Sequence, residues 1–325
     1  MQIGSMNNKE RIVRFQKLIC DSLVPLINDD YVLLDIPNHC NIGDNLIWEG
    51  ELQFLKENVH HKCLYSANVF NWEEKDIQTA PIILFHGGGN FGDLYRVCQL
   101  HRLYITRKYH CKKIIIFPQT VWYNDISLLK DDSVIFNAHP NIFICTRDQL
   151  SYDTLAQYIN KEKLLLLPDM AFCIRKLPLS NSSLGKKVLF MLRTDDEIDR
   201  NFEIKMEGCD VKDWPTYYNN RYVQLIMNII RGEKVKLSVL FQKIPLIRKM
   251  VDPVYGLNCK NSRRRYIKKG VSFFESYEKI YTTRLHGLIL GILMNKEITI
   301  IDNKYNKCRY FYQTWLKDFD SIISE

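Results

Sequence analysis

The ten cysteines of this chain include no C-x-x-C pair, and no uninterrupted apolar stretch is long enough to span a bilayer. Scattered thiols are typical of a reducing compartment, where cysteine serves as a small apolar side chain. The chain opens without the charged and apolar leader of a secreted protein, and it has no internal repeat or low-complexity segment. We therefore expect a cytoplasmic protein, with at most peripheral contact to the inner face of a membrane.

The composition that is present is that of a folded protein of 325 residues, 46% hydrophobic and 25% charged. This length favours two domains in an α/β protein. Lys and Arg outnumber Asp and Glu by 45 to 37, and the formal net charge of +8 suits an anionic ligand, a membrane surface or nucleic acid. Part of the surplus lies at 263–269, where a solvated basic loop and a phosphate contact are about equally favoured.

Short apolar runs alternate with amphipathic stretches of helical length in the first half of the chain. We predict a helix over 9–26 and strands over 31–36, 62–66, 81–85, 113–117, 142–145 and 163–167. Such alternation is typical of a mostly parallel, doubly wound sheet. A stretch rich in Pro, Ser and Asn interrupts the pattern, and we place a domain boundary there, between residues 1–178 and 179–325.

The second domain is less regular than the first. A strand is predicted over 187–192, and an apolar helix followed by a strand over 298–302 ends the pattern. Between them, 195–265 offers only a plausible helix over 218–231 and a mixed apolar stretch over 235–250. The second domain is therefore expected to be α/β, and reduced compared with a full Rossmann-like domain.

Two glycine-containing turns, each with an acidic residue, follow predicted strands: Asn41-Ile42-Gly43-Asp44-Asn45 and Gly87-Gly88-Gly89-Asn90-Phe91-Gly92-Asp93. Ligands of open α/β sheets collect at such strand ends, and glycine permits close backbone approach. Neither turn matches a dinucleotide fingerprint or a phosphate-binding loop with a terminal Lys. From local sequence, Asp93 is equally compatible with a cap on the following helix and with a functional carboxylate.

A third motif, Thr283-Arg284-Leu285-His286-Gly287, precedes the apolar helix of the second half. On an extended segment the side chains of Arg284 and His286 would point the same way. A guanidinium can hold a carboxylate or phosphate, and an imidazole can move a proton near neutral pH. Arg193, at the end of the strand 187–192, could bind a second anionic group. The alternative is a capping arginine, a core histidine and a surface arginine.

Taken in chain order, these motifs form a recognisable succession. It contains Asn41 to Asp44, Gly87 to Asp93, Pro118-Gln119-Thr120, Thr146-Arg147-Asp148 with Ser151, Pro168-Asp169-Met170-Ala171-Phe172, Arg193, Thr283 to Gly287, and Asp302 to Lys307. The succession closely resembles the polysaccharide pyruvyl transferase family, over most of the chain.

The resemblance implies two Rossmann-like domains that face each other across a cleft, as in GT-B glycosyltransferases, with the acceptor on the N-terminal side and the donor on the C-terminal side. It implies transfer of a pyruvyl group from phosphoenolpyruvate to a sugar of an exopolysaccharide, a capsular polysaccharide or a precursor, with ketal formation and release of phosphate. It implies no metal or other cofactor, and no His/Cys cluster has metal-ligand spacing. The expected partners are a sugar acceptor, either lipid-linked or not, and no nucleic acid.

Carried over by position, the resemblance also implies roles for single residues. Arg193 and Arg284 would hold the phosphate and carboxylate of phosphoenolpyruvate, and His286 would protonate its methylene carbon. Asp93 would accept the proton of the attacking hydroxyl or orient the acceptor. Five residues of the two glycine turns are expected on the acceptor side, with simple turn formation as their alternative role: Asn41, Asp44, Gly88, Gly89 and Asn90.

Two other functions stay open at this point. A GT-B glycosyltransferase would use a nucleotide sugar, and Glu275 or Glu278 could then bind its ribose, although no spacing marks either residue. A glycan- or nucleic-acid-binding module would use the basic segment 263–269, but the ordered interleaving of basic and aromatic residues typical of such modules is missing from the sequence.

Overall fold

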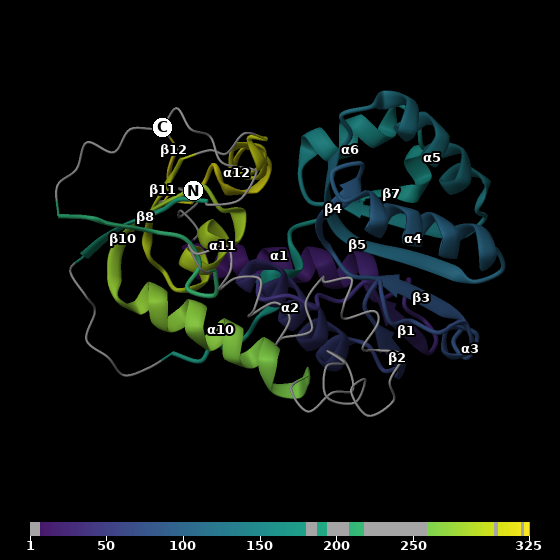
Figure 1. Cartoon of the computed structure of the whole chain (residues 1–325), viewed down its shortest axis with the longest axis horizontal. Coiled ribbons are helices and arrows are strands. Elements are labelled where there is room, and N and C mark those ends of the chain that lie inside the picture. The colour runs from purple at the N-terminus through teal and green to yellow at the C-terminus, as the bar shows by residue number, and fades with distance from the viewer. Residues whose placement is uncertain are drawn as a thin grey trace, which may run out of the picture. The chain divides into compact units, whose positions relative to one another are not determined.

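The computed structural model describes residues 7–179, 187–193, 208–217, 259–301, 305–319 and 322–324. These residues form two compact units, each with its own β-sheet (Figure 1). Unit 1 contains the described residues up to Val13, the segment Asn38–Leu46, and the described residues from Arg175 onward. Unit 2 contains Arg14–Pro37 and Ile47–Ile174.

The sheet of unit 2 is parallel in every strand pair and has the order β2-β1-β3-β5-β6-β7, with β4 paired to β5. Its strands are β1 (Tyr31–Leu34), β2 (Cys63–Ala67), β3 (Ile82–Phe85), β4 (Gly88–Gly92), β5 (Lys113–Trp122), β6 (Ile142–Thr146) and β7 (Leu164–Leu166). All residues of β1 and β3 are buried. Strands of parallel sheets are covered on both faces, which explains their continuous apolar sequences.

Helices alternate with these strands along the chain except between β3 and β4, as in other doubly wound sheets (Figure 1). They are α1 (Asn8–Leu23), α2 (Ile42–Asn58), α3 (Glu74–Ile77), α4 (Arg96–Lys108), α5 (Ile126–Ala138), α6 (Gln149–Ala156), and two 3-10 turns, η1 (Lys161–Lys163) and η2 (Met170–Cys173). Leu103 of α4, Phe136 of α5 and Leu155 of α6 share one buried cluster with side chains of the strands. Helices α1 and α2 each contribute residues to both units.

Unit 1 contains a five-stranded sheet of order β12-β11-β10-β8-β9, again parallel in every pair. Its strands are β8 (Lys187–Met191), β9 (Asp210–Lys212), β10 (Tyr277–Thr282), β11 (Glu297–Ile300) and β12 (Ile322–Ser324). Its helices are α10 (Cys259–Glu275), α11 (Leu285–Leu293) and α12 (Lys307–Phe311), and α12 continues into a π-helical turn, η3 (Tyr312–Leu316). Seven of the nine residues of α11 are buried, which agrees with its apolar sequence.

The predicted α/β class with mainly parallel sheets is confirmed. The strands that were missed include the short β9 and β12 and also β4: the segment Gly88–Gly92, interpreted as a turn, pairs with β5. Glycine is a poor strand former, so this glycine-rich segment carries no strand signal in the sequence. In the structure Gly88 and Gly92 have positive φ angles of 135° and 118°. The domain boundary after residue 178 and the cleft between domains stay predictions.

Several predictions fall outside the described residues. These are the helix over 218–231, the apolar stretch over 235–250, and residues 302–304 of the last motif. In the part of the chain that the structure describes, no helix has the length and hydropathy needed to cross a membrane.

Candidate active site

The segment Thr283–Gly287 connects β10 to α11 at the carboxyl edge of the unit 1 sheet. Its backbone is tied to the neighbouring strand β8: the N–H of Thr283 donates to the carbonyl of Met191 at 3.1 Å, and Thr283 Oγ1 accepts the N–H of Arg193 at 3.1 Å. The predicted pair Arg193 and Arg284 therefore comes from the ends of two adjacent parallel strands. Arg284 itself has extended backbone (φ −107°, ψ 122°), as expected for the residue before a helix.

The Arg284 side chain is buried, and its orientation is fixed from two directions. Its Nε and Nη2 donate to the two carboxylate oxygens of Asp213, with 2.6 Å from Nη2 to Oδ2. Its guanidinium carbon lies 5.1 Å from the centre of the Tyr217 ring. A bidentate carboxylate and an aromatic face together hold a guanidinium in one plane. Because the group has five N–H donors, this pairing does not by itself exclude a second acceptor.

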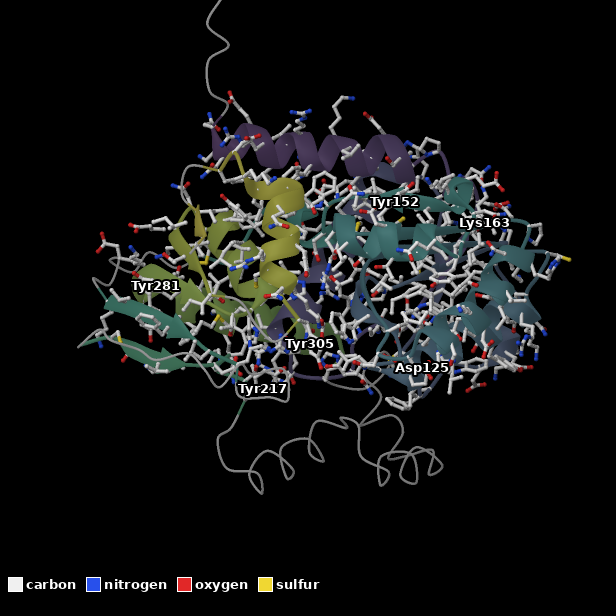
Figure 2. The ribbon with its side chains drawn as sticks, turned by 90° about the horizontal axis from the view of Figure 1, so that it is seen from above. Asp125, Tyr152, Lys163, Tyr217, Tyr281 and Tyr305 are labelled. Carbon is white, nitrogen blue, oxygen red and sulfur yellow. The ribbon has the colours of Figure 1, made fainter. Side chains whose placement is uncertain are left out.

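Tyr217 ends the described segment 208–217 and is labelled in Figure 2. Burial raises the pKa of its phenol well above the ordinary value of 10.0, and the nearby Arg284 only partly offsets this effect. The phenol therefore keeps its proton at neutral pH. Tyr217 and Asp213 were not predicted as site residues. The one available signal was the Trp214-Pro215 turn beside them.

His286 is the second residue of α11, is half-buried, and packs against the first turn of α2. A β-carbon on Gly43 would lie 2.4 Å from His286 Nδ1 and 2.8 Å from its Cβ and Cγ. Asn41 stands just before this turn: its Oδ1 accepts the N–H of Gly43 at 3.0 Å and its Nδ2 donates to Asp44 Oδ2 at 2.8 Å. Asn41 and Asp44 thus belong to the compact unit that contains His286. Their contact with the acceptor stays a prediction.

The other predicted residues, Gly88, Gly89, Asn90 and Asp93, belong to unit 2. Asn90 Nδ2 donates to Asp35 Oδ2 at 2.9 Å, and its Oδ1 accepts from Arg102 Nη2 at 2.9 Å. Both polar atoms of this amide are therefore engaged, which holds Asn90 in one orientation within β4.

Asp93 does not cap the helix that follows it, so that alternative is wrong. Helix α4 begins at Arg96, with Tyr95 in the capping position. The carboxylate of Asp93 instead accepts the backbone N–H groups of Asn124 at 2.6 Å and Asp125 at 2.8 Å, and the Asn124 side chain at 3.1 Å. Asp125, labelled in Figure 2, is itself the N-cap of α5. Asp93 therefore ties the connection after β4 to the start of α5.

Three motifs of the family succession meet in one buried polar network of unit 2. Arg147 donates from Nε to Thr120 Oγ1 at 2.8 Å and from Nη1 to Asp169 Oδ2 at 2.7 Å. Thr120 Oγ1 donates in turn to Asp148 Oδ2 at 3.0 Å. Each of these side chains is less than 10% exposed. The network joins the ends of β5, β6 and β7, which gives these motif residues a role in shaping the carboxyl edge of the sheet.

A buried acid–imidazole pair lies under the glycine turn and was not predicted. Glu51 of α2 bonds His86 Nδ1 through Oε2 at 2.8 Å and accepts the N–H of Gly87 through Oε1 at 2.8 Å. Burial raises the pKa of Glu51, against the opposing effects of His86 and Gly87. The position of His86 directly before the three glycines was the signal that could have found it.

One group of potential metal ligands occurs among the described residues: Asp29, Asp30 and His61, whose ligand atoms lie within 4.8 Å of one another. They come just before β1 and β2, at the opposite end of the strands from the glycine turn. Asp30 Oδ1 already accepts the N–H of Lys62 at 2.7 Å. This group is separate from the predicted site residues.

Comparison with known proteins gives consistent results. The family model described as polysaccharide pyruvyl transferase matches residues 41–305. A Bacillus subtilis protein whose name assigns it to the pyruvyl transferases, EpsO, is 30% identical over 295 residues, which is 90% of this chain and 87% of that protein. Pyruvyl transferase 1 of Schizosaccharomyces pombe is 30% identical over 301 residues, which is 87% of this chain and 69% of that protein.

A crystal structure of an uncharacterised protein from Klebsiella pneumoniae has a similar fold. The TM-score is 0.58 with 19% sequence identity, and the match covers 98% of this chain and 99% of that one. At this identity the likeness concerns the fold alone. The family match and the two relatives, which each extend over most of this sequence, establish that the chain belongs to the polysaccharide pyruvyl transferase family and is a transferase.

Proposed function

We propose that this protein transfers a pyruvyl group from phosphoenolpyruvate to a sugar of a polysaccharide or its precursor, forming a ketal and releasing phosphate. Family membership supports pyruvyl transfer to a sugar. The observation that carries the donor assignment is the origin of Arg193, Arg284 and His286 at the carboxyl ends of β8 and β10. Phosphoenolpyruvate has two anionic groups next to a carbon that must be protonated, so it suits two guanidinium groups and an imidazole.

In this proposal the donor is held by the two arginines. Arg284 has a fixed plane, set by Asp213 and Tyr217, and offers a preorganised edge to a carboxylate or phosphate. Arg193 extends from the adjacent strand end and binds the other anionic group. Asp213 acts through Arg284 and is a positioning residue.

The reaction then follows from the chemistry of an enol phosphate. His286 gives its proton to the methylene carbon, and the electron pair of the carbon–carbon double bond forms the new C–H bond. The adjacent carbon becomes electron-poor, and a sugar hydroxyl oxygen attacks it. A second hydroxyl of the same sugar then attacks the same carbon. The bond between this carbon and the bridging oxygen of the phosphate breaks, phosphate leaves, and the ketal closes. One hydroxyl proton restores His286 and the other leaves with phosphate.

Acceptor binding is assigned to the carboxyl edge of the unit 2 sheet. Asp93 is half-buried at this edge and held by three hydrogen bonds, so its carboxylate is oriented to accept or align a hydroxyl. Gly88, Gly89 and Asn90 lie in the preceding strand β4, and in this proposal they offer backbone groups to sugar hydroxyls. Asn41 and Asp44 are proposed as further acceptor contacts, for an acceptor that is either lipid-linked or soluble.

The test is incubation of the purified protein with phosphoenolpyruvate and a panel of oligosaccharide acceptors, read by mass for a pyruvate ketal and by phosphate release. We expect His286→Ala to lower turnover by about 10²- to 10⁴-fold, since general acid catalysis typically contributes that much. The exposed His60→Ala is the matched control and should keep wild-type turnover. Near wild-type turnover of His286→Ala would remove the proton-donor role, and absence of any pyruvylated product across the panel would count against the proposed reaction.

A further inference from the structure

We infer that Gly43 is a positioning residue for His286: because Gly43 has no side chain, the imidazole packs directly against the first turn of α2, and this contact sets its position for proton transfer. The inference rests on the proposed proton-donor role of His286. It assigns to the glycine of the Asn41–Asn45 turn a function in the proton transfer step, in addition to the acceptor contacts proposed for its neighbours.

The contact between Gly43 and His286 is closer than any side chain at position 43 would permit. The nearest atoms to a β-carbon there would be Nδ1, Cβ and Cγ of His286, at 2.4, 2.8 and 2.8 Å, whereas ordinary van der Waals contact begins at 3.4 Å. The α2 turn thus covers the Nδ1 edge of the ring.

Conformation does not explain the glycine. Gly43 is not among the glycines with positive φ, and it lies in the first turn of a regular helix. Because alanine is a better helix former than glycine, helix stability alone would favour Ala at this position. Close approach to His286 is the physical reason that remains.

The backbone on the α2 side of the contact is held in place. Asn41 Oδ1 accepts the N–H of Gly43 at 3.0 Å, which is the usual bond of a helix N-cap. Asn45 Nδ2 donates to the carbonyls of His39 at 3.0 Å and Asn41 at 2.7 Å. These bonds explain why Asn residues flank the glycine, and they prevent the turn from moving away from an added methyl group.

The backbone on the His286 side is held as well. The next residue, Gly287, is buried, and a β-carbon there would lie 2.6 Å from Thr282 Oγ1 and 2.8 Å from Met191 Sδ. A methyl group at position 43 would meet both the imidazole and the β-carbon of His286, so the whole side chain has to shift, and Nδ1 has to move by about 1 Å to restore ordinary contact. A displacement of this size can lower the rate of a chemical step by about 100-fold.

The test compares Gly43→Ala with Gly291→Ala. Gly291 is on the same helix as His286, and the atoms nearest to its added methyl would belong to Ile298 and Phe274. We expect Gly43→Ala to lower kcat for pyruvyl transfer by about 100-fold, with less than about a threefold change in KM for phosphoenolpyruvate, and to alter the pH–rate profile. Gly291→Ala should keep kcat and the pH–rate profile even if it lowers the unfolding temperature.

A readout independent of activity is the ¹⁵N NMR signal of the His286 ring, assigned by its loss in His286→Ala. Gly43→Ala should shift this signal and Gly291→Ala should not. If wild-type protein makes no pyruvylated product, the proposed function fails, while the shift still tests the contact. An unshifted signal, or a shifted signal with wild-type kcat, overturns the inference.

A double variant keeps the inference testable if Gly43→Ala does not fold. Combining Gly43→Ala with His286→Gly removes the side chain that the new methyl would meet, so we expect the double variant to fold. Failure of the double variant to fold would place the obstruction elsewhere and overturn the inference.

Discussion

At the scale of single residues, one buried histidine makes the stability of the protein depend on pH in the acid range. His101 of α4 is 7% exposed, and its ring lies 5.0 Å from the Trp72 ring. Neither ring nitrogen has a hydrogen-bond partner among the described residues. Burial, with a smaller contribution from Arg102, lowers the pKa of His101 from 6.5 to about 3.

This pKa predicts a loss of stability below pH 6.5. The unfolded chain takes up a proton at His101 near its ordinary pKa of 6.5, whereas the folded protein does so only near 3. Stability that is complete above pH 6.5 is therefore lost as the pH falls toward 3, by about 1.4 kcal/mol per pH unit. Between pH 7.5 and 5.0, His101→Phe should lose about 2 kcal/mol less than the wild type in urea unfolding. Equal losses in the two proteins would contradict a neutral His101.

Single residues also show where sequence interpretation reaches its limit. Arg284 and His286 were identifiable because their spacing and the strand-to-helix transition are local signals. Asp213 and Tyr217 were not, because their contacts with Arg284 join segments far apart in the chain. The glycine of the first turn was interpreted as permitting close approach of a ligand, and the sequence does not reveal that His286 packs against it.

At the scale of elements, one buried cation joins α4 to the strands of unit 2. Arg102 is fully buried, and its Nη2 contacts Asp35 Oδ2 at 3.3 Å, directly after β1, and Asn90 Oδ1 at 2.9 Å in β4. Its guanidinium carbon also lies 5.7 Å from the ring centre of Phe85 and 5.1 Å from that of Phe91. The pKa of Asp35 is raised by burial, and Arg102 opposes that rise.

Replacement of this cation should destabilise the protein strongly. Arg102→Met leaves the carboxylate of Asp35 buried without its cationic partner, and we expect a loss of about 3–5 kcal/mol in the free energy of unfolding. Asp35 has a φ of 62°, a conformation that Asn also adopts, so Asp35→Asn is a compatible second change. The double variant should lose clearly less than the sum of the single variants in guanidinium unfolding. Strictly additive losses would show that the two residues are not coupled.

Elements were predictable to the extent that their patterns are local. The apolar runs of β1, β3 and β5 and the amphipathic α1 appear close to their predicted positions. Strand β4 consists largely of glycine, and its pairing depends on β5, which follows later in the chain. Strands β9 and β12 have three residues each, too few to show alternation or a distinct apolar run.

At the scale of the whole molecule, the order of the motifs was more informative than any one of them. Together they indicated the family that the comparisons confirm. The division of the chain between the two compact units was not predictable, because Asn38–Leu46 groups with residues from the second half of the chain. Its contacts, such as Cys40 Sγ to the carbonyl of Thr216 at 3.5 Å, join residues that no sequence window contains.

The donor can be tested on the whole protein without knowledge of the acceptor. A ligand that binds only the folded state stabilises it by mass action, by about 2.7 kcal/mol at one hundred times its dissociation constant. We therefore expect phosphoenolpyruvate, and more weakly inorganic phosphate, to raise the unfolding temperature, and Arg193→Ala to abolish the rise. Stabilisation by a nucleotide sugar and not by phosphoenolpyruvate would favour the glycosyltransferase alternative.

The membership of Asn38–Leu46 in unit 1 has a consequence for how the protein is made. A ribosome releases the chain from the N-terminus at roughly 5–20 residues per second, and early segments begin to fold before later ones exist. The strands of the unit 2 sheet are all complete by Leu166. The turn that carries Gly43, in contrast, has to wait for Thr283–Gly287 to be translated before it meets its partner. Nascent chains arrested between these two points should carry a finished first sheet and an exposed, protease-sensitive Asn38–Leu46 segment.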